Sequence, residues 1–172
     1  MATLNREAHI IALDTAFKKK LADVASASFV IIGDDIEELA YELNPDTERI
    51  KNILGKTKTR DNGYEPSFDA DPFYADPDSG LYTKLRDIAL ERKKGDDCKT
   101  LMLDIIVEDT SASTHLAYLR EAMVKPVSYG GDTSGFSIPF TVSEDGDWKK
   151  GTVTAASITA GAPVFTADTG SN

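Results

Sequence analysis

The chain has 172 residues, of which 41% are hydrophobic and 12 are glycine, so it is long enough to bury a core and unlike a two-domain protein. Its 29 acidic and 19 basic residues give a formal charge of −10, which argues against a surface made to grip nucleic acid or an anionic membrane. With one cysteine, Cys98, no apolar run near the ~20 residues that cross a bilayer, and a start, MATLNREAHIIALD, that lacks a signal pattern, we expect a protein made in a reducing cytosol.

Residues 1–30 allow two interpretations. Apolar side chains recur at helical spacing around three lysines, which is typical of an amphipathic helix. The alternative is an N-terminal arm, extended near His9 to Leu13, that orders against a neighbouring molecule. We prefer the arm, because of the resemblance described below. The apolar residues at helical spacing are Ile10, Leu13, Phe17, Leu21 and Val24.

From residue 27 the pattern becomes that of β-strands. Residues 29–32 are β-branched or aromatic and end at Gly33, and residues 36–43 alternate between apolar and acidic side chains. Asn44-Pro45-Asp46 is a sequence typical of turns, and residues 48–57 are predicted to run back along residues 36–43. The two segments are therefore predicted to form a protruding hairpin. The following segment, Thr57 to Pro77, is predicted to be an irregular loop that carries aromatic anchors.

The clearest local prediction is a helix at about residues 79–94. Pro77 cannot lie inside a helix, and Ser79 offers an oxygen to the free N–H groups of a first turn. Basic residues fill the last turn, and Gly95 is expected to end the helix in a left-handed conformation. The apolar face consists of Leu81, Leu85 and Ile88.

Alternating strands follow the helix. Residues 101–107 have one fully apolar face, residues 116–129 alternate more weakly, and residues 136–142 form another strand. Residues 143–147 are predicted to turn the chain into an antiparallel partner at 148–159. From residue 161 the chain is predicted to be a flexible tail. The fold class expected is therefore mainly β, with α+β character: a two-sheet β-sandwich or half-barrel with one flanking helix, whose β domain spans residues 30–160.

The search for catalytic or metal-binding patterns gives no candidate. His9 and His115 have no cysteine or carboxylate at ligand spacing, and the acids before Cys98 disfavour its thiolate. Four aspartates between Asp69 and Asp78 lack the glycine and the final glutamate of a calcium-binding loop. We therefore assign no catalytic, cofactor-binding or metal-binding residue, and expect a protein that is not an enzyme and has no cofactor.

Three features in the same order resemble the major tail protein, or tail tube protein, of long-tailed bacteriophages and prophages. They are the Gly63-Tyr64-Glu65-Pro66-Ser67 loop after the hairpin, the short helix ending in Lys93-Lys94-Gly95-Asp96-Asp97, and strands ending near Asp147-Trp148-Lys149-Lys150-Gly151. The likeness covers about residues 30–160. It implies a structural protein of six subunits per ring, with an extended N-terminal segment and rings that stack into a tube through which DNA passes without specific binding.

The resemblance also implies partners and a location. The partners are further copies of the chain and other tail proteins, namely tape measure, tail tip and terminator, with no membrane. The location is the virion, after assembly in the cytoplasm of the host bacterium.

A tube that lets DNA slide needs a negative lumen, because basic side chains would hold phosphates. The lumen-facing candidates are the acids on predicted strands: Glu38, Glu42, Asp104 and Glu108. The candidates for contacts between rings or subunits are the apolar anchors of the hairpin and loop: Ile50, Ile53, Leu54, Tyr64, Phe68, Phe73 and Tyr74. The alternative function is a carbohydrate-binding or adhesion β-sandwich module of phage or bacterial origin, which would use Tyr64, Phe68, Phe73, Tyr74 and Trp148.

Overall fold

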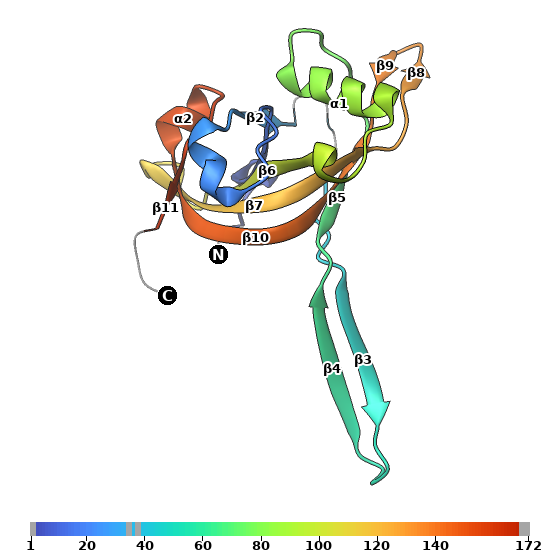
Figure 1. Ribbon diagram of the computed structural model, residues 1–172. Helices are drawn as coiled ribbons and strands as arrows, with labels where there is room; N and C mark the ends of the chain where they lie inside the picture. The colour runs from blue at the N-terminus through green and yellow to red at the C-terminus, as the bar shows by residue number, and fades with distance from the viewer. Residues whose placement is uncertain (1–2, 34–35, 37–38, 169–172) are drawn as a thin grey trace.

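The computed structural model describes residues 3–33, 36 and 39–168 of the chain. The protein is mainly β, and a curled sheet forms a half-barrel with few helices, as the sequence predicts. A two-stranded hairpin, β3–β4, projects from the body of the molecule (Figure 1).

The main sheet has seven antiparallel strands. Its order is β11-β10-β7-β6-β1-β2, and β5 pairs with another part of β10. A third, short pair is formed by β8 and β9. The strands of the main sheet are β1 (His9–Asp14), β2 (Phe29–Ile32), β5 (Ser67–Ala70), β6 (Lys99–Ile106), β7 (Thr114–Pro126), β10 (Phe140–Thr154) and β11 (Phe165–Ala167). The other strands are β3 (Pro45–Lys51), β4 (Thr57–Tyr64), β8 (Gly130–Asp132) and β9 (Gly135–Ser137).

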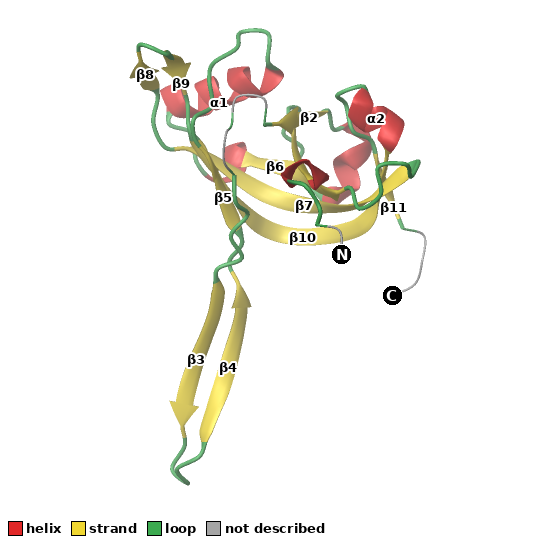
Figure 2. Cartoon of the chain, turned by 180° about the vertical axis from the view of Figure 1, so that it is seen from behind, coloured by secondary structure: helices red, strands yellow, loops and turns green. Residues whose placement is uncertain are grey.

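Two α-helices and three short 3-10 helices complete the described fold (Figure 2). The α-helices are α1 (Gly80–Glu91) and α2 (Ala155–Thr159), and the 3-10 helices are Arg6–Ala8, Leu21–Ser26 and Gly95–Cys98. α1 lies at the end of the molecule opposite the projecting hairpin, close to β8 and β9.

Helix α1 confirms the strongest local prediction. The Ser79 hydroxyl caps its start by accepting the N–H of Tyr82, and the three predicted apolar residues are buried. The helix ends at Glu91, earlier than predicted, because Arg92 already takes the left-handed conformation, with φ of 53°; Gly95, with φ of 67°, begins the next 3-10 helix instead. The Arg92 guanidinium stabilises this end by donating to the Ala89 carbonyl and lying over the Tyr129 ring.

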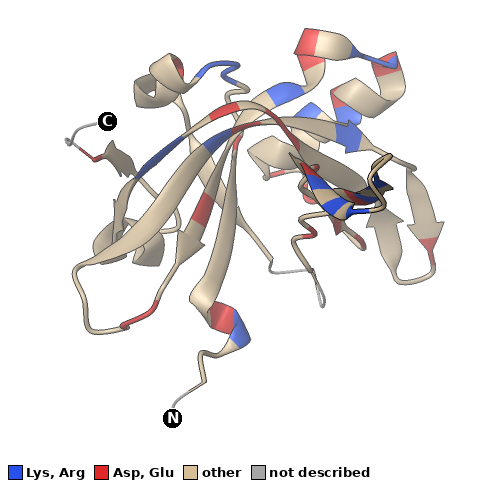
Figure 3. Cartoon of the chain, turned by 90° about the horizontal axis from the view of Figure 1, so that it is seen from below, with Lys and Arg blue, Asp and Glu red and all other residues tan. Residues whose placement is uncertain are grey.

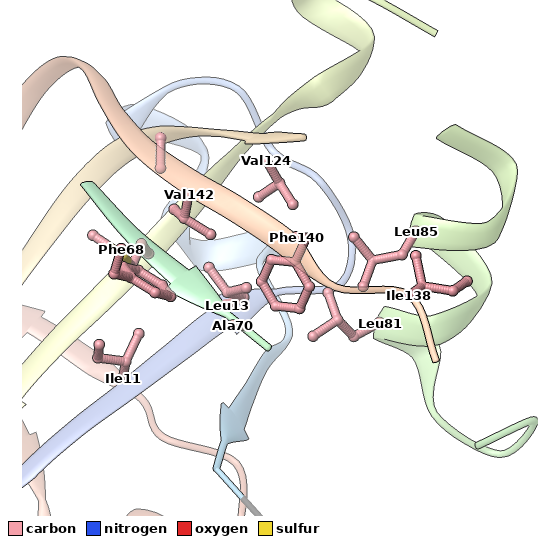
Figure 4. Packing of buried hydrophobic residues seen from close by; sticks show 12 residues of the cluster. Ile11, Leu13, Phe68, Ala70, Leu81, Leu85, Val124, Ile138, Phe140 and Val142 are labelled. Atoms are coloured by element: carbon pink, nitrogen blue, oxygen red, sulfur yellow. The ribbon is translucent and has the colours of Figure 1, made fainter. Parts of the chain in front are cut away.

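Two hydrophobic clusters lie on the two faces of the main sheet. Met102 belongs to the first cluster, whereas its neighbours Leu101 and Leu103 belong to the second, as the two-residue period of β6 requires. The first cluster also takes in α1 through Leu81 and Leu85 (Figure 4). Both clusters therefore depend on β6 and β7, whose alternation the sequence predicts.

The amphipathic helix considered for the N-terminal region is absent. Residues 9–14 form β1, and Leu21 lies on a separate 3-10 helix. The helical spacing of these apolar residues in the sequence is therefore a coincidence. The extended conformation expected for the arm is present, but β1 lies inside the chain's own sheet, between β2 and β6. The first strand is thus a core element.

The predicted hairpin is present as β3 and β4, but its turn lies at a different position from the one predicted. Asn44-Pro45-Asp46 lies at the base, and the turn falls at residues 52–56 instead. Of the predicted strand at residues 36–43, the described part makes only an isolated bridge between Glu42 and Ser67. The segment predicted to be an irregular loop, Thr57 to Pro77, supplies β4 and β5.

The turn predicted at residues 143–147 is a β-bulge within one long strand. β10 stays paired with β7 on both sides, and three residues of β10 oppose Glu121 alone. The Glu121 carboxylate accepts the N–H of Asp147, and Gly146, with φ of 130°, leaves room for that carboxylate. The glycine and acids that indicate a turn therefore serve the bulge.

The segment after residue 160 is not a free tail throughout. Phe165–Ala167 forms β11 on the outer edge of β10, and Phe165 packs against the second cluster. The contact with β10 extends to Asp168, whose N–H donates to the Lys150 carbonyl.

Candidate interaction site

The projecting hairpin is the most distinctive surface of the molecule. β3 and β4 pair only with each other, and a seven-residue strand gives the hairpin a reach of about 23 Å. Nearly all its residues are exposed, so it has no hydrophobic core of its own. A two-stranded hairpin is marginally stable in water, which makes such an element hard to explain without a partner.

The tip of the hairpin is a defined turn that presents two apolar side chains. The Asn52 side-chain oxygen accepts the N–H groups of Leu54 and Lys56, each at 3.0 Å. Gly55, with φ of 76°, closes the turn. Ile53 is fully exposed and Leu54 is 76% exposed. Backbone and side-chain bonds thus hold an apolar pair away from the body.

The predicted inter-subunit residues divide into two groups. Ile53, Leu54 and Tyr64 are exposed on the hairpin, and Ile50 lies on it half-buried.

Phe68 and Phe73 do not form part of that surface. Phe68 is 2% exposed in the first cluster, and Phe73 stacks edge-on against Phe140 at 5.3 Å. The prediction for Phe68 is wrong because it lies on β5, whose pairing with β10 turns the side chain inward. Tyr74 is half-buried and pairs through its backbone with Ser137, away from the hairpin.

A groove of about 1050 Å³ lies at the base of the hairpin. It is bounded by the N-terminal segment, the hairpin base and one face of the sheet. Figure 3, which views the molecule from the side on which the hairpin projects, shows acidic and basic residues interspersed over the body. The lining combines apolar, aromatic and charged side chains, among them Leu4, His9, Leu39, Tyr41, Leu43, Tyr64, Asp104, Ile106, Arg120, Glu144 and Trp148.

Apart from Arg6, the charged residues of the groove form one linked row. Asp104 lies 2.5 Å from His9 Nε2 and 3.7 Å from the Arg120 guanidinium. Arg120 Nε lies 3.3 Å from Glu144, an ion pair whose geometry does not make a hydrogen bond. Tyr41 donates its hydroxyl hydrogen to Glu144 and ends the row. Two carboxylates therefore flank Arg120 and offset its charge.

Burial, together with the hydrogen bond to Glu144 and the negative charge of that carboxylate, raises the pKa of Tyr41 well above its usual range. Because the folded pKa is raised, this group contributes its stability in full below about pH 10, the pKa of an unfolded tyrosine, and loses it as pH rises further. We expect Tyr41 to stay protonated in the folded protein at about pH 11.

Tyrosinate absorbance, measured during an alkaline titration of the folded protein, tests this. The wild-type chain has six tyrosines, and Tyr41→Phe is expected to lose none of the absorbance gained up to about pH 11. If the variant gains one tyrosinate fewer than wild type, the expectation is wrong.

The lumen-facing candidates do not come together in the described fold. Asp104 lines the groove, Glu42 is exposed on the segment bridged to Ser67, and Glu108 is exposed beyond the end of β6. Glu38 lies outside the described residues. Whether the other three face a lumen stays a prediction.

Sequence reasoning missed most of the groove. Two of its links, His9 with Asp104 and Tyr41 with Glu144, join residues about a hundred positions apart, so no local spacing indicates them. The one available signal was the aromatic and charged alternation of β7 around Tyr118 and Arg120, which marks a face that is not core.

Within residues 3–33, 36 and 39–168, no group of three or more histidine, cysteine or acidic side chains is arranged to hold a metal ion. Neither α-helix of the described chain is long and apolar enough to span a membrane. A scan against protein-family models finds no match, and a search of curated protein sequences finds none either.

Proposed function

We propose that the chain is a structural subunit of a phage tail tube, which forms hexameric rings that stack around a lumen that conducts DNA. The observation that carries this proposal is the hairpin. Ile53 and Leu54 are held on an ordered turn about 23 Å from the core, where only another molecule can cover them. A self-assembling protein needs such a surface.

The half-barrel sheet supports the same function. β2 is an edge strand that, among the described residues, pairs only with β1, and three of its side chains, Val30, Ile31 and Ile32, are only partly buried. The outer edge of β10 is likewise unpaired between β5 and β11. Closure of several subunits into a ring would remove these edges.

The charge distribution suits passage of DNA through such a ring. In the groove, Asp104 and Glu144 offset the positive charge of Arg120, and Arg6, which also lines the groove, donates to the backbone carbonyls of His9 and Leu39. The chain as a whole carries −10. Weak attraction to phosphates is what a sliding polymer requires.

A hairpin-tip variant tests the assembly function. We expect Ile53→Asp with Leu54→Asp to prevent rings and tubes, because two charges would be buried in an apolar contact. Unfolding temperature and far-ultraviolet circular dichroism should match wild type, since neither side chain contributes to the core. Negative-stain electron microscopy and sedimentation measure the assembly.

The control is Ala25→Asp with Ser26→Asp, which adds the same charge at exposed sites on the body and spares the hairpin. Tubes of normal length from the tip variant would show that the tip is not an assembly contact. A wild-type chain that stays monomeric at every concentration and salt tested would contradict the tail-tube function itself.

A second candidate function, glycan binding, is favoured by one specific observation in the groove. Trp148 is 58% exposed beside Tyr118, with ring centroids 5.7 Å apart, and Tyr64 is exposed nearby on the groove wall. Aromatic faces next to carboxylates suit a sugar ring. A glycan array with the wild-type chain and with Trp148→Ala would support this function only if binding is present and is lost in the variant.

A further inference from the structure

Charge is divided unevenly between the outer hairpin, residues 49–60, and the rest of the chain. The outer hairpin has five basic residues and no acidic one, a formal charge of +5. The remaining sequence has 14 basic and 29 acidic residues, a formal charge of −15. The five basic residues are Arg49, Lys51, Lys56, Lys58 and Arg60.

Most of this positive charge is not neutralised within the subunit. Arg60 pairs with Glu48 at 3.0 Å, but the other four basic residues form no ion pair with any described residue. They surround the apolar tip of Ile53 and Leu54. The surface that fits the outer hairpin therefore has to be acidic around an apolar centre.

One patch at the opposite end of the same chain has this composition, beside α1 and its basic residues Lys84 and Arg86. The loop before α1 and the β8–β9 pair lie at the end away from the hairpin (Figures 1 and 2). Asp76, Asp78 and Asp132 are exposed there, and Phe136 is 46% exposed. The N–H of Ala75 donates to the Phe136 carbonyl at 2.9 Å, which joins the backbone of the loop before α1 to β9. We call these four residues, Asp76, Asp78, Asp132 and Phe136, the acidic end.

We propose that the outer hairpin of one copy docks against the acidic end of a second copy, head to tail. This inference rests on the proposed function, because it names the two surfaces through which successive subunits along a tube would contact each other. Two different surfaces at opposite ends make a contact that repeats without closing, which gives a linear and polar stack. The opposite charges also favour this orientation over head-to-head encounter.

A second copy fits the hairpin better than nucleic acid does. The apolar tip matches Phe136, whereas DNA would meet a body of charge −15 behind the hairpin. A basic two-stranded ribbon can enter a DNA groove, so DNA binding is one outcome that the experiment has to detect.

Charge exchange tests the docking. We expect Lys51→Glu, Lys56→Glu and Lys58→Glu together to raise the concentration needed for assembly about tenfold or more. Asp76→Lys, Asp78→Lys and Asp132→Lys should do the same, and the six substitutions in one chain should restore assembly. The control is Lys19→Glu, Lys20→Glu and Lys149→Glu, which changes net charge equally at exposed sites elsewhere and should have little effect.

A second readout separates this inference from the tail-tube function. A chain with Leu54→Cys and Phe136→Cys, treated with a short thiol cross-linker, should give a ladder of covalent oligomers, while each single variant gives none beyond dimers. A ladder without rings or tubes would support the docking and contradict the tube. Tubes that give no ladder and tolerate both charge-reversed triples would overturn the docking alone. Duplex DNA binding that the hairpin triple abolishes, with self-association unchanged, would overturn it too.

Discussion

Replacement of Asp14 by alanine is expected to lower the free energy of unfolding by about 3 to 5 kcal/mol. The Asp14 side chain is fully buried, and its carboxylate accepts the backbone N–H groups of Ala16, Lys18 and Ser28 at 2.7 to 2.8 Å. These bonds join the end of β1 to the segment that enters β2. Alanine would remove the acceptor of three part-buried N–H groups, and a donor left unsatisfied in a buried position costs about 1 to 3 kcal/mol.

Urea or guanidinium denaturation measures this change. Asp14→Asn keeps one acceptor oxygen in the same place and should lose less stability than Asp14→Ala. Asp23→Ala removes an exposed carboxylate from the neighbouring 3-10 helix and should change stability by no more than about 0.5 kcal/mol. A stability of Asp14→Ala within that same margin of wild type would contradict the role given to the buried carboxylate.

Phe68→Ala is expected to destabilise the fold by about 3 to 5 kcal/mol, the usual effect of removing a buried phenyl ring. Phe68 lies opposite Val142 across the β5–β10 pair and packs against Tyr41, with ring centroids 5.4 Å apart. Its removal leaves a cavity in the first cluster. Thermal and chemical denaturation of the isolated subunit, at concentrations below assembly, measure the effect.

The matched control is Tyr64→Ala, four residues earlier in the chain. Tyr64 is 62% exposed at the end of β4, so its loss should leave the free energy of unfolding almost unchanged. If both variants unfold like wild type, Phe68 is not a core residue and the sequence-based assignment of it to a contact surface regains support.

Local pattern was sufficient wherever a segment's own sequence decides its structure. α1 was predictable because Pro77, Ser79 and the spacing of Leu81, Leu85 and Ile88 all act within the helix. β6 and β7 were predictable because a strand with one face more buried than the other leaves a two-residue period in the sequence. The exposed apolar pair, Ile53 and Leu54, was also named from sequence, although the turn that presents it was placed at the wrong end of the hairpin.

Pairing between distant segments decided the rest. Phe68 looks like any other aromatic residue of a polar stretch until β5 pairs with β10. The residues 143–147 look like a turn until Glu121 on β7 supplies the acceptor that turns them into a bulge. The groove depends on contacts of this kind throughout, since His9, Asp104 and Arg120 come from three strands. No window along the chain contains that information.

The central position of β1 in the sheet has a consequence for the order of events during synthesis. β1 ends at Asp14 and pairs on one side with β2, which begins at Phe29, and on the other side with β6, in the register His9 with Ile106. A ribosome adds roughly 5 to 20 residues per second, so the β1–β2 pair waits for several seconds with one apolar edge exposed before β6 leaves the exit tunnel. Closing a loop of this length is slow as well. Nascent chains are therefore most vulnerable to aggregation or chaperone capture in this interval, before β6 pairs with β1.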